Sequence, residues 1–226
     1  MSSSKPKRGF WVAIDGPAGS GKTSVGRRLA AALGFRFIST GAMYRAVAWG
    51  LRRGLPLEAM EIELRDGRVL FNGEDITEEL YTEEIDQLTS EIARDPAVRQ
   101  FLIKKQRALA QGQDVVMEGR DIGTVVLPDA DVKLFLKASP AERARRRATE
   151  RGSTPEEMLQ EIAERDARDQ GFGRLVPAPD AIVIDTENLS LEEVVARALA
   201  AVCAVREGKD AEAKAEDEGE DQGMAS

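Results

Sequence analysis

The chain has 226 residues, of which 42% are hydrophobic and 32% are charged, and it contains one cysteine and no histidine. This length is typical of one domain with small insertions. It has no apolar run near the roughly 20 residues of a membrane helix and no signal-peptide pattern, so we expect a cytoplasmic protein without a membrane partner. The lack of histidine excludes Ser-His-Asp and Cys-His nucleophilic catalysis and zinc sites that need imidazole.

The net charge of −8 is concentrated at one end of the chain. Residues 207–226 hold 8 acidic and 2 basic side chains, which leaves a net charge of −2 for the rest. A nearly neutral body argues against a general nucleic-acid surface, so we expect no nucleic-acid partner. Residues 1–9 are predicted to be a disordered lead, 10–206 a single domain, and 207–226 a disordered acidic tail.

Short apolar runs alternate with helical patterns through the predicted domain. The predicted strands are 10–15, 35–38, 114–118, 132–136 and 181–184. The predicted helices are 23–33, 41–53, 95–111, 140–150, 155–168 and 190–204. This alternation indicates an α/β fold in which helices cover both faces of a parallel sheet. Only residues 61–77 break the alternation, because the turn signals Asp66-Gly67 and Asn72-Gly73 predict a small antiparallel hairpin there.

A phosphate-binding sequence follows the first predicted strand. Residues 16–23 read Gly-Pro-Ala-Gly-Ser-Gly-Lys-Thr and lead directly into a helix. Small residues let successive backbone N–H groups converge on phosphates, while Lys22 can reach the β- and γ-phosphates and Thr23 can offer a hydroxyl to Mg²⁺. We therefore predict that ATP·Mg²⁺ is bound by Gly16, Pro17, Ala18, Gly19, Ser20, Gly21, Lys22, Thr23 and Ser24. Switch proteins, mechanical ATPases and small-molecule kinases share this P-loop, so it leaves the acceptor open.

Two further clusters follow predicted strand ends, where ligands bind in open α/β sheets. Thr40 can cap a helix that carries Tyr44 and Arg45 one turn later. Arg120-Asp121 lies between two glycines after strand 114–118. The arginines suit a phosphate monoester and the aspartate suits a base amino group, although a structural salt bridge is the alternative for Arg120-Asp121.

Arginines are also concentrated between residues 143 and 174. Phosphoryl transfer spreads negative charge over oxygens, so an Arg-rich lid that closes and excludes water is the expected device. We place this lid at about 150–175. Intrahelical ion pairs, such as Glu142 with Arg146, are the alternative role for some of these arginines.

Four segments together resemble the bacterial cytidylate kinases. They are residues 14–22, 40–45, 118–126 and 165–169, and the resemblance covers about residues 10–204. Adenylate kinases share the first segment and a segment similar to the second. They lack the third, and their Gly-Phe-Pro-Arg type segment is absent here.

This resemblance implies a three-layer P-loop kinase fold, with a nucleoside-monophosphate-binding insert at about 56–92. It implies transfer of the γ-phosphoryl group of ATP to CMP or dCMP, with Lys22, Arg120 and Arg165 as catalytic residues. The implied CMP contacts are Thr40, Tyr44, Arg45, Ser90, Arg99, Arg120, Asp121, Arg165 and Asp169. The family usually has an arginine soon after the position of Asp169, whereas here residues 170–173 intervene and the stretch to Asp180 is about two residues short. Arg174 is the next arginine and is included among the CMP contacts, and whether it replaces the family's lid arginine stays open at this point.

We predict in-line transfer without a covalent intermediate or a general base, because the acceptor phosphate is already a good nucleophile. Mg²⁺, held in part by Thr23, is the expected cofactor of ATP. ATP and CMP or dCMP are the expected partners of a monomer. Two alternatives stay open: a kinase for UMP or AMP, and a nucleotide-dependent switch, although the Asn-Lys-x-Asp segment that a switch would need is absent.

Overall fold

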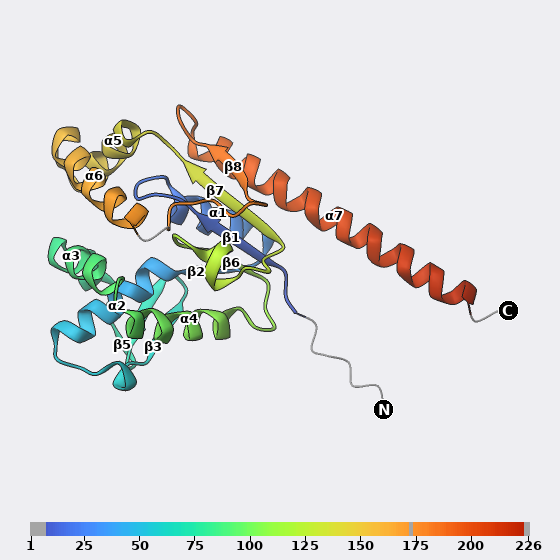
Figure 1. Cartoon of the computed structure of the whole chain (residues 1–226), viewed down its shortest axis with the longest axis horizontal. Coiled ribbons are helices and arrows are strands. Elements are labelled where there is room, and N and C mark those ends of the chain that lie inside the picture. Colours follow the sequence, from blue (N-terminus) through green and yellow to red (C-terminus); the bar gives the residue numbers. More distant parts are fainter. Residues whose placement is uncertain (1–7, 172–173, 224–226) are drawn as a thin grey trace.

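The computed structural model of the chain describes residues 8–171 and 174–223, so the lead at 1–7 and lid residues 172–173 lie outside it. Its centre is a five-stranded parallel sheet with the order β2-β6-β1-β7-β8 (Figure 1). The strands are β1 (Trp11–Asp15), β2 (Arg36–Ser39), β6 (Val115–Glu118), β7 (Val132–Lys137) and β8 (Ile182–Asp185). Each boundary falls within one residue of its prediction, which confirms the predicted α/β fold.

The α-helices follow the predicted order with one addition, α3. They are α1 (Lys22–Leu33), α2 (Thr40–Arg52), α3 (Glu83–Ile92), α4 (Pro96–Ala110), α5 (Pro140–Arg151), α6 (Pro155–Gly171) and α7 (Leu191–Gly223). The sequence pattern did not predict α3, which begins after Thr82, whose hydroxyl accepts a hydrogen bond from Ile85 N at 3.3 Å. Threonine is a preferred residue at this capping position.

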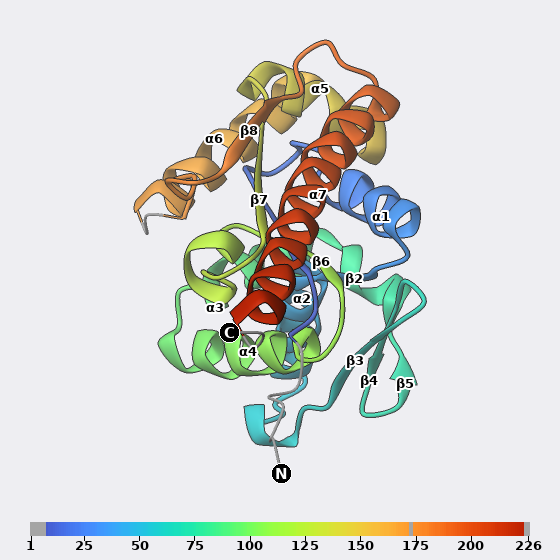
Figure 2. The ribbon, with the colours of Figure 1, turned by 90° about the vertical axis from the view of Figure 1, so that its right-hand side faces the viewer.

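Alternation along the strands gives the sheet two buried faces. In β1, Val12 and Ile14 pack with α1 and α7, which crosses in front of the sheet in Figure 2. Ala13 belongs instead to the core beneath α2 and α4. Side chains of a strand point alternately to the two faces, so a short apolar run such as 11–15 can fill both cores.

The insert forms a small antiparallel sheet beside the main one. Its strands are β3 (Ile62–Arg65), β4 (Arg68–Phe71) and β5 (Glu74–Asp75), with short 3₁₀ turns at Leu57–Ala59 and Thr77–Tyr81. Asp66-Gly67 and Asn72-Gly73 form the two turns with positive φ angles of 51° and 80°, and of 49° and 87°. Such angles suit the tight turns of hairpins. The predicted hairpin is confirmed, and a short third strand extends it.

The C-terminal segment differs from its prediction. Helix α7 continues to Gly223, so residues 207–223 are helical where the sequence pattern suggested a disordered tail (Figure 1). Val202 and Val205 of α7 pack with the core of the sheet, and Lys209 pairs with Asp131. The sequence that follows is rich in Ala, Glu and Lys, which have high helix propensity, and this propensity favours a helix where composition suggested a tail.

Asp131 bonds residues near the start of the described chain and on α7. Its carboxylate pairs with Arg8 at 2.7 Å, accepts the Trp11 N–H at 2.6 Å and pairs with Lys209 of α7. The Arg8 guanidinium also lies 4.4 Å from the ring centre of Trp11. Residues 8 and 9 of the predicted lead are therefore part of the fold.

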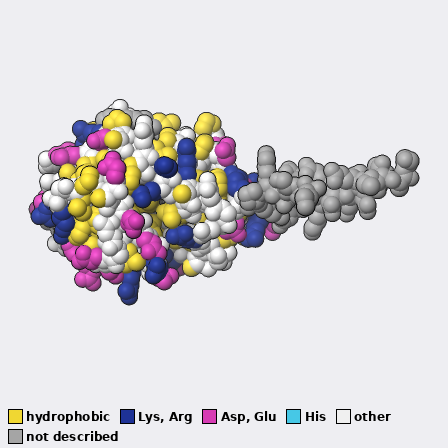
Figure 3. Space-filling model, turned by 90° about the horizontal axis from the view of Figure 1, so that it is seen from below, with side chains coloured by type: hydrophobic (Ala, Val, Ile, Leu, Met, Phe, Trp, Pro, Cys, Tyr) yellow, Lys and Arg dark blue, Asp and Glu magenta, His cyan; other side chains and the backbone are white. Residues whose placement is uncertain are grey.

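The surface carries mixed charge. On the face drawn in Figure 3, basic and acidic side chains are interspersed over the body without a continuous basic area. None of the helices in the described ranges is both long and apolar enough to cross a membrane.

Candidate active site

The loop between β1 and α1 has the backbone that a phosphate site needs. Gly16, Gly19 and Gly21 have φ angles of 150°, 75° and 88°, which glycine adopts without strain. A Cβ on Gly16 would also lie only 2.3 Å from the carbonyl oxygen of Leu136 in β7. Close packing against the next strand therefore requires glycine, and the loop is held over the carboxyl edge of the sheet.

Lys22 is buried at the start of α1 and donates a hydrogen bond to the carbonyl oxygen of Pro17 at 2.7 Å. Burial, followed by the charge of Arg120, lowers the pKa of Lys22 to about 7. Within the described chain, the buried hydroxyl of Ser20 has no hydrogen-bond partner. A buried ammonium and a spare hydroxyl are groups that a phosphate can satisfy.

One cavity brings the predicted donor and acceptor residues together. From the loop it is lined by Ala18, Gly19, Lys22 and Thr23. Every residue predicted to contact the acceptor lines it too: Thr40, Tyr44, Arg45, Ser90, Arg99, Arg120, Asp121, Arg165, Asp169 and Arg174. The other predicted ATP contacts, Gly16, Pro17, Ser20, Gly21 and Ser24, do not line this cavity, although Gly21 and Ser24 line a neighbouring one. Residues from α2, α3, α4, α6 and the ends of strands thus meet at one place.

Arg99 and Asp121 form the base-reading pair of the sequence prediction. Arg99 Nη2 donates to Asp121 Oδ2 at 2.6 Å, and both side chains are mostly buried. Tyr44 lies beside this pair, and burial, more than the neighbouring charges, raises its pKa. Ser90 donates its hydroxyl to the carbonyl oxygen of Asp86 at 3.0 Å, which holds its side chain against α3.

Arg174 reaches the same part of the cavity from beyond the lid helix. Its guanidinium donates to the carbonyl oxygen of Ala93, at the end of α3. Burial and then the charge of Arg99 lower its pKa, which marks it as a second cation beside the Arg99–Asp121 pair. Arg174 thus lines the same cavity as Arg99 and Asp121.

A second group of arginines lines the cavity nearer to α5 and α6. Arg120 pairs with Asp169 at 3.2 Å and also donates to Gly16 O at 3.3 Å. Burial, then the charges of Arg120 and Arg45, lower the pKa of Arg165. A guanidinium has a very high ordinary pKa and stays charged, so this crowding leaves a positive centre beside the phosphate loop.

Glu118 at the end of β6 is a site residue that the sequence reasoning did not assign. Its carboxylate accepts the hydroxyls of Ser39 at 2.6 Å and Thr23 at 3.2 Å, and its backbone oxygen accepts the Thr40 hydroxyl at 2.8 Å. The following Gly119 is packed closely, because a Cβ there would lie 2.6 Å from Thr40 Oγ1. The position of Glu118 at a strand end in a Glu-Gly-Arg-Asp segment was the signal that could have identified it.

Asp15 positions the loop that carries Arg120 and Asp121. Its carboxylate accepts the backbone N–H groups of Ile122 and Gly123, both at 2.8 Å. Burial raises the pKa of Asp15 to about 6 despite these bonds. Directly after Asp121, residues Ile122–Val126 form a short π-helical turn that the sequence pattern did not predict. The Arg-Asp pair is thus fixed by a buried carboxylate at the end of β1.

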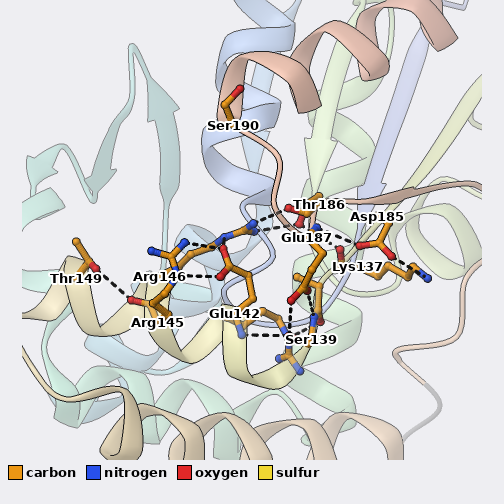
Figure 4. A network of polar contacts seen from close by, with 12 residues as sticks. Lys137, Ser139, Glu142, Arg145, Arg146, Thr149, Asp185, Thr186, Glu187 and Ser190 are labelled. Carbon is orange, nitrogen blue, oxygen red and sulfur yellow. Dashed lines mark hydrogen bonds and ion pairs between the residues drawn. The ribbon is translucent and has the colours of Figure 1, made fainter.

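The arginines at 143–147 divide into different roles. Arg145 and Arg146 pair with Glu142 on their own helix at 2.8 Å, as the intrahelical alternative predicts, and Arg146 also bonds Thr186 (Figure 4). Arg143 joins the phosphate loop to the lid helix, because it bonds Ala18 O at 3.1 Å and Asp166 at 2.5 Å. Arg143 and Arg146 thus fix α5 to neighbouring elements, whereas Arg145 is an exposed intrahelical partner.

The structure thus has a P-loop at the end of β1, an acceptor cavity at the same edge of the sheet and a helical, Arg-rich lid. Together they define a P-loop phosphotransferase of the nucleoside monophosphate kinase type. The family model for cytidylate kinase matches residues 12–204.

Relatives of known name agree with this match. A cytidylate kinase from Pelotomaculum thermopropionicum is 48% identical over 218 residues, covering 86% of this chain and 96% of its own length. One from Caldanaerobacter subterraneus is 48% identical over 209 residues, covering 84% and 93%. A gluconokinase structure from Sinorhizobium meliloti shares the fold at 20% identity, with a TM-score of 0.52 over 92% of this chain and 99% of its own. The chain belongs to the cytidylate kinase family.

Proposed function

We propose that this protein transfers the γ-phosphoryl group of ATP to CMP or dCMP, giving ADP and CDP or dCDP. The observation that carries the proposal is the Arg99–Asp121 pair, which lines the same cavity as the P-loop residue Lys22. The family match supports the same reaction.

The Arg99–Asp121 pair suits cytosine better than the other bases. The Asp121 carboxylate can accept from the exocyclic amino group, while Arg99 can donate to the ring nitrogen and the neighbouring carbonyl oxygen. Uracil presents a carbonyl oxygen where cytosine presents the amino group, so it would face the carboxylate and leave buried groups unpaired. Sites built on such hydrogen bonds reject the analogue that lacks the partner group.

The transfer itself needs charge stabilisation and alignment more than proton transfer. The acceptor oxygen belongs to a phosphate monoester that is already ionised, so no general base is required. Lys22, Arg120 and Arg165 supply positive charge where the transferred group passes between the two oxygens. The lid helices exclude water, which would otherwise compete as the acceptor.

The residues at the end of β6 fit Mg²⁺. The hydroxyl of Thr23 lies 3.2 Å from the Glu118 carboxylate, so two oxygen donors stand beside the phosphate loop. Among the described residues no cluster of three acidic, histidine or cysteine side chains forms a metal cage. One carboxylate, one hydroxyl and substrate phosphates are a typical Mg²⁺ donor set, and the ion would supply charge neutralisation of the triphosphate. Within the proposal, Thr23 and Glu118 hold this ion directly or through water.

A coupled assay that detects ADP tests the proposal. The protein is supplied with ATP, Mg²⁺ and in turn CMP, dCMP, UMP or AMP. CMP or dCMP should give the highest kcat/KM. A higher kcat/KM for UMP or AMP would replace the proposal with the corresponding monophosphate kinase, and ATP hydrolysis without any preferred acceptor would favour a nucleotide switch. The monomeric state and cytoplasmic location remain sequence predictions.

A further inference from the structure

Asp86 in the first turn of α3 is a mostly buried carboxylate that faces three arginines. Its Oδ1 accepts from Arg45 Nε at 3.1 Å and Nη2 at 2.6 Å. Its Oδ2 accepts from Arg147 at 3.4 Å and from Arg151. Arg45 belongs to α2 on the acceptor side, whereas Arg147 and Arg151 belong to α5. One side chain therefore joins the acceptor part to the lid side of the cavity.

The charges in this cluster do not cancel. Three guanidiniums surround one carboxylate, so a positive excess remains, and Arg45 and Arg147 both line the acceptor cavity. Glu161 of α6 offsets part of this excess through Arg151, at 2.9 Å. Arg147 Nε is buried, and no atom of the described chain accepts its hydrogen bond. Asp86 thus gathers the guanidiniums while leaving donor capacity for a phosphate group.

The helix that carries Arg147 and Arg151 is itself firmly attached to the sheet. Midway along the helix, Arg146 bonds the hydroxyl of Thr186 at 3.0 Å and the Thr186 backbone oxygen at 2.7 Å, and at the N-cap Ser139 bonds Glu187 (Figure 4). Helix α3, in contrast, lies in the insert and faces the α5–α6 pair (Figure 1). A contact from α3 to α5 consequently fixes the acceptor part against a rigid support.

We propose that Asp86 is a positioning residue that clasps Arg45 and Arg147 together and holds the acceptor part against α5 before substrates bind. This proposal rests on the proposed phosphoryl transfer, because it places Arg45 and Arg147 where the acceptor phosphate must lie. The acceptor phosphate enters a site whose cations are already assembled. Asp86 itself does not touch the substrate.

The charge state of Asp86 suits this role. Burial alone would raise its pKa, but the charges of Arg45 and Arg165 outweigh burial, and the pKa lies below its ordinary value. A carboxyl with a lowered pKa stays ionised throughout the neutral range. The facing groups are Arg45 from α2, Arg147 and Arg151 from α5, and Arg165 and Glu161 from α6. The clasp therefore operates without a pH switch near neutrality.

Distance measurement in the ligand-free protein tests the clasp directly. Cys203→Ser removes the native thiol, and Arg65→Cys in β3 and Gln160→Cys in α6 then supply two sites for spin labels. Both positions are exposed. Asp86→Asn should lengthen and broaden the distance without substrates, and CMP with a non-hydrolysable ATP analogue should restore the short distance. An unchanged ligand-free distance in Asp86→Asn would overturn the proposal, whether or not the proposed reaction holds.

Kinetics provide a second, independent test. Asp86→Asn should lower kcat/KM for CMP about 10-fold to 100-fold, which is typical of a small misplacement of reacting groups. The effect on KM for ATP should be smaller, and Asp86→Glu should recover part of the loss. Asp131→Asn is the matched control, since it removes a buried carboxylate with two basic partners at the other edge of the sheet. An equal loss of kcat/KM for CMP in Asp86→Asn and Asp131→Asn would show that Asp86 only stabilises the fold.

Arg151→Gln keeps the test open if Asp86→Asn does not fold. Arg151 is more exposed than Asp86 and lies outside the acceptor cavity, but it is the arginine that extends the clasp along α5. Its replacement should by itself lengthen the label distance, and an unchanged distance would contradict the clasp. Where Asp86→Asn folds, combining the two changes should add little further change, as for residues in one network. Full additivity of the two changes would contradict a shared clasp. Turnover of CMP by the unmutated protein separately reports whether the proposed function is correct.

Discussion

Asp121 lines the acceptor cavity, Asp86 lies behind its arginines, and the two carboxylates differ in the number of arginines that they bond. Asp121 pairs with Arg99, whereas Asp86 contacts Arg45, Arg147 and Arg151. The Arg99–Asp121 pair offers a donor and an acceptor side by side, which suits a flat heterocyclic base. A three-to-one cluster keeps positive charge, which suits a phosphate. We therefore expect a base end of the cavity at Asp121 and a phosphate end beside Arg45 and Arg147.

Lys22→Met tests the phosphate end and should have the largest effect. Loss of the buried ammonium should lower kcat about 100-fold to 1000-fold, as for the loss of one preorganised electrostatic group in other enzymes. The loss should be similar for every monophosphate acceptor, because Lys22 does not read the base. Initial rates with saturating CMP and UMP measure it, and circular dichroism checks the fold. Near-normal turnover would remove Lys22 from the reaction.

Asp121→Ala tests the base end and should change preference more than rate with the best acceptor. Without the carboxylate, the ratio of kcat/KM for CMP to that for UMP should fall about 10-fold to 100-fold, the range expected for a lost hydrogen bond to a charged group. Lys22→Met serves as the comparison variant, since it should leave this ratio unchanged. A preserved preference in Asp121→Ala would show that the base is read elsewhere.

Arg174→Ala asks whether the cation beside the Arg99–Asp121 pair contributes to acceptor binding. We expect KM for CMP to rise about 10-fold with a smaller change in kcat, because one charge-assisted hydrogen bond is lost. Arg145→Ala is the control, as Arg145 is exposed on α5 and pairs with Glu142 outside the cavity. If both variants behave alike, Arg174 has no part in the acceptor site.

The lowered pKa of Lys22 predicts proton uptake when ATP binds. With a pKa of about 7, most Lys22 side chains are neutral at pH 8 in the ligand-free protein. The triphosphate stabilises the ammonium and raises the pKa toward its ordinary value, so binding takes up a fraction of one proton at pH 8. Titration calorimetry in buffers of different ionisation enthalpy measures this fraction. Lys22→Met should abolish it, and proton release by the unmutated protein would contradict the sign.

The sequence was sufficient for the sheet and for most residues of the cavity. Apolar runs of four to six residues mark buried parallel strands, and the carboxyl ends of such strands meet at one edge. Tyr44, Arg120 and Asp121 could therefore be assigned to one site from the sequence alone, although they are far apart in the chain. Their contacts were beyond the sequence, since which carboxylate pairs with which arginine depends on tertiary packing.

Helix α3 shows where the sequence reasoning failed. Ile85, Leu88 and Ile92 follow Thr82 with helical spacing, yet four acidic residues lie in the same segment and make the apolar pattern weak. Because α3 was not predicted, neither the side on which the Asp86 carboxylate lies nor its arginine partners could be predicted. The prediction for the acidic end of α7 failed in the same sense, because a helix was present where none was expected. A composition typical of a solvated tail can also have high helix propensity.

The bonds of Asp131 to Arg8, Trp11 and Lys209 have a consequence for the use of this protein. They bring Arg8 and Lys209 to the edge of the sheet where β1 and β7 begin, whereas the cavity opens where the strands end. A surface tether attached beside Arg8 or Lys209 would accordingly stand away from the entrance for nucleotides. The molecule can be held at this edge while substrates reach the cavity from the opposite one.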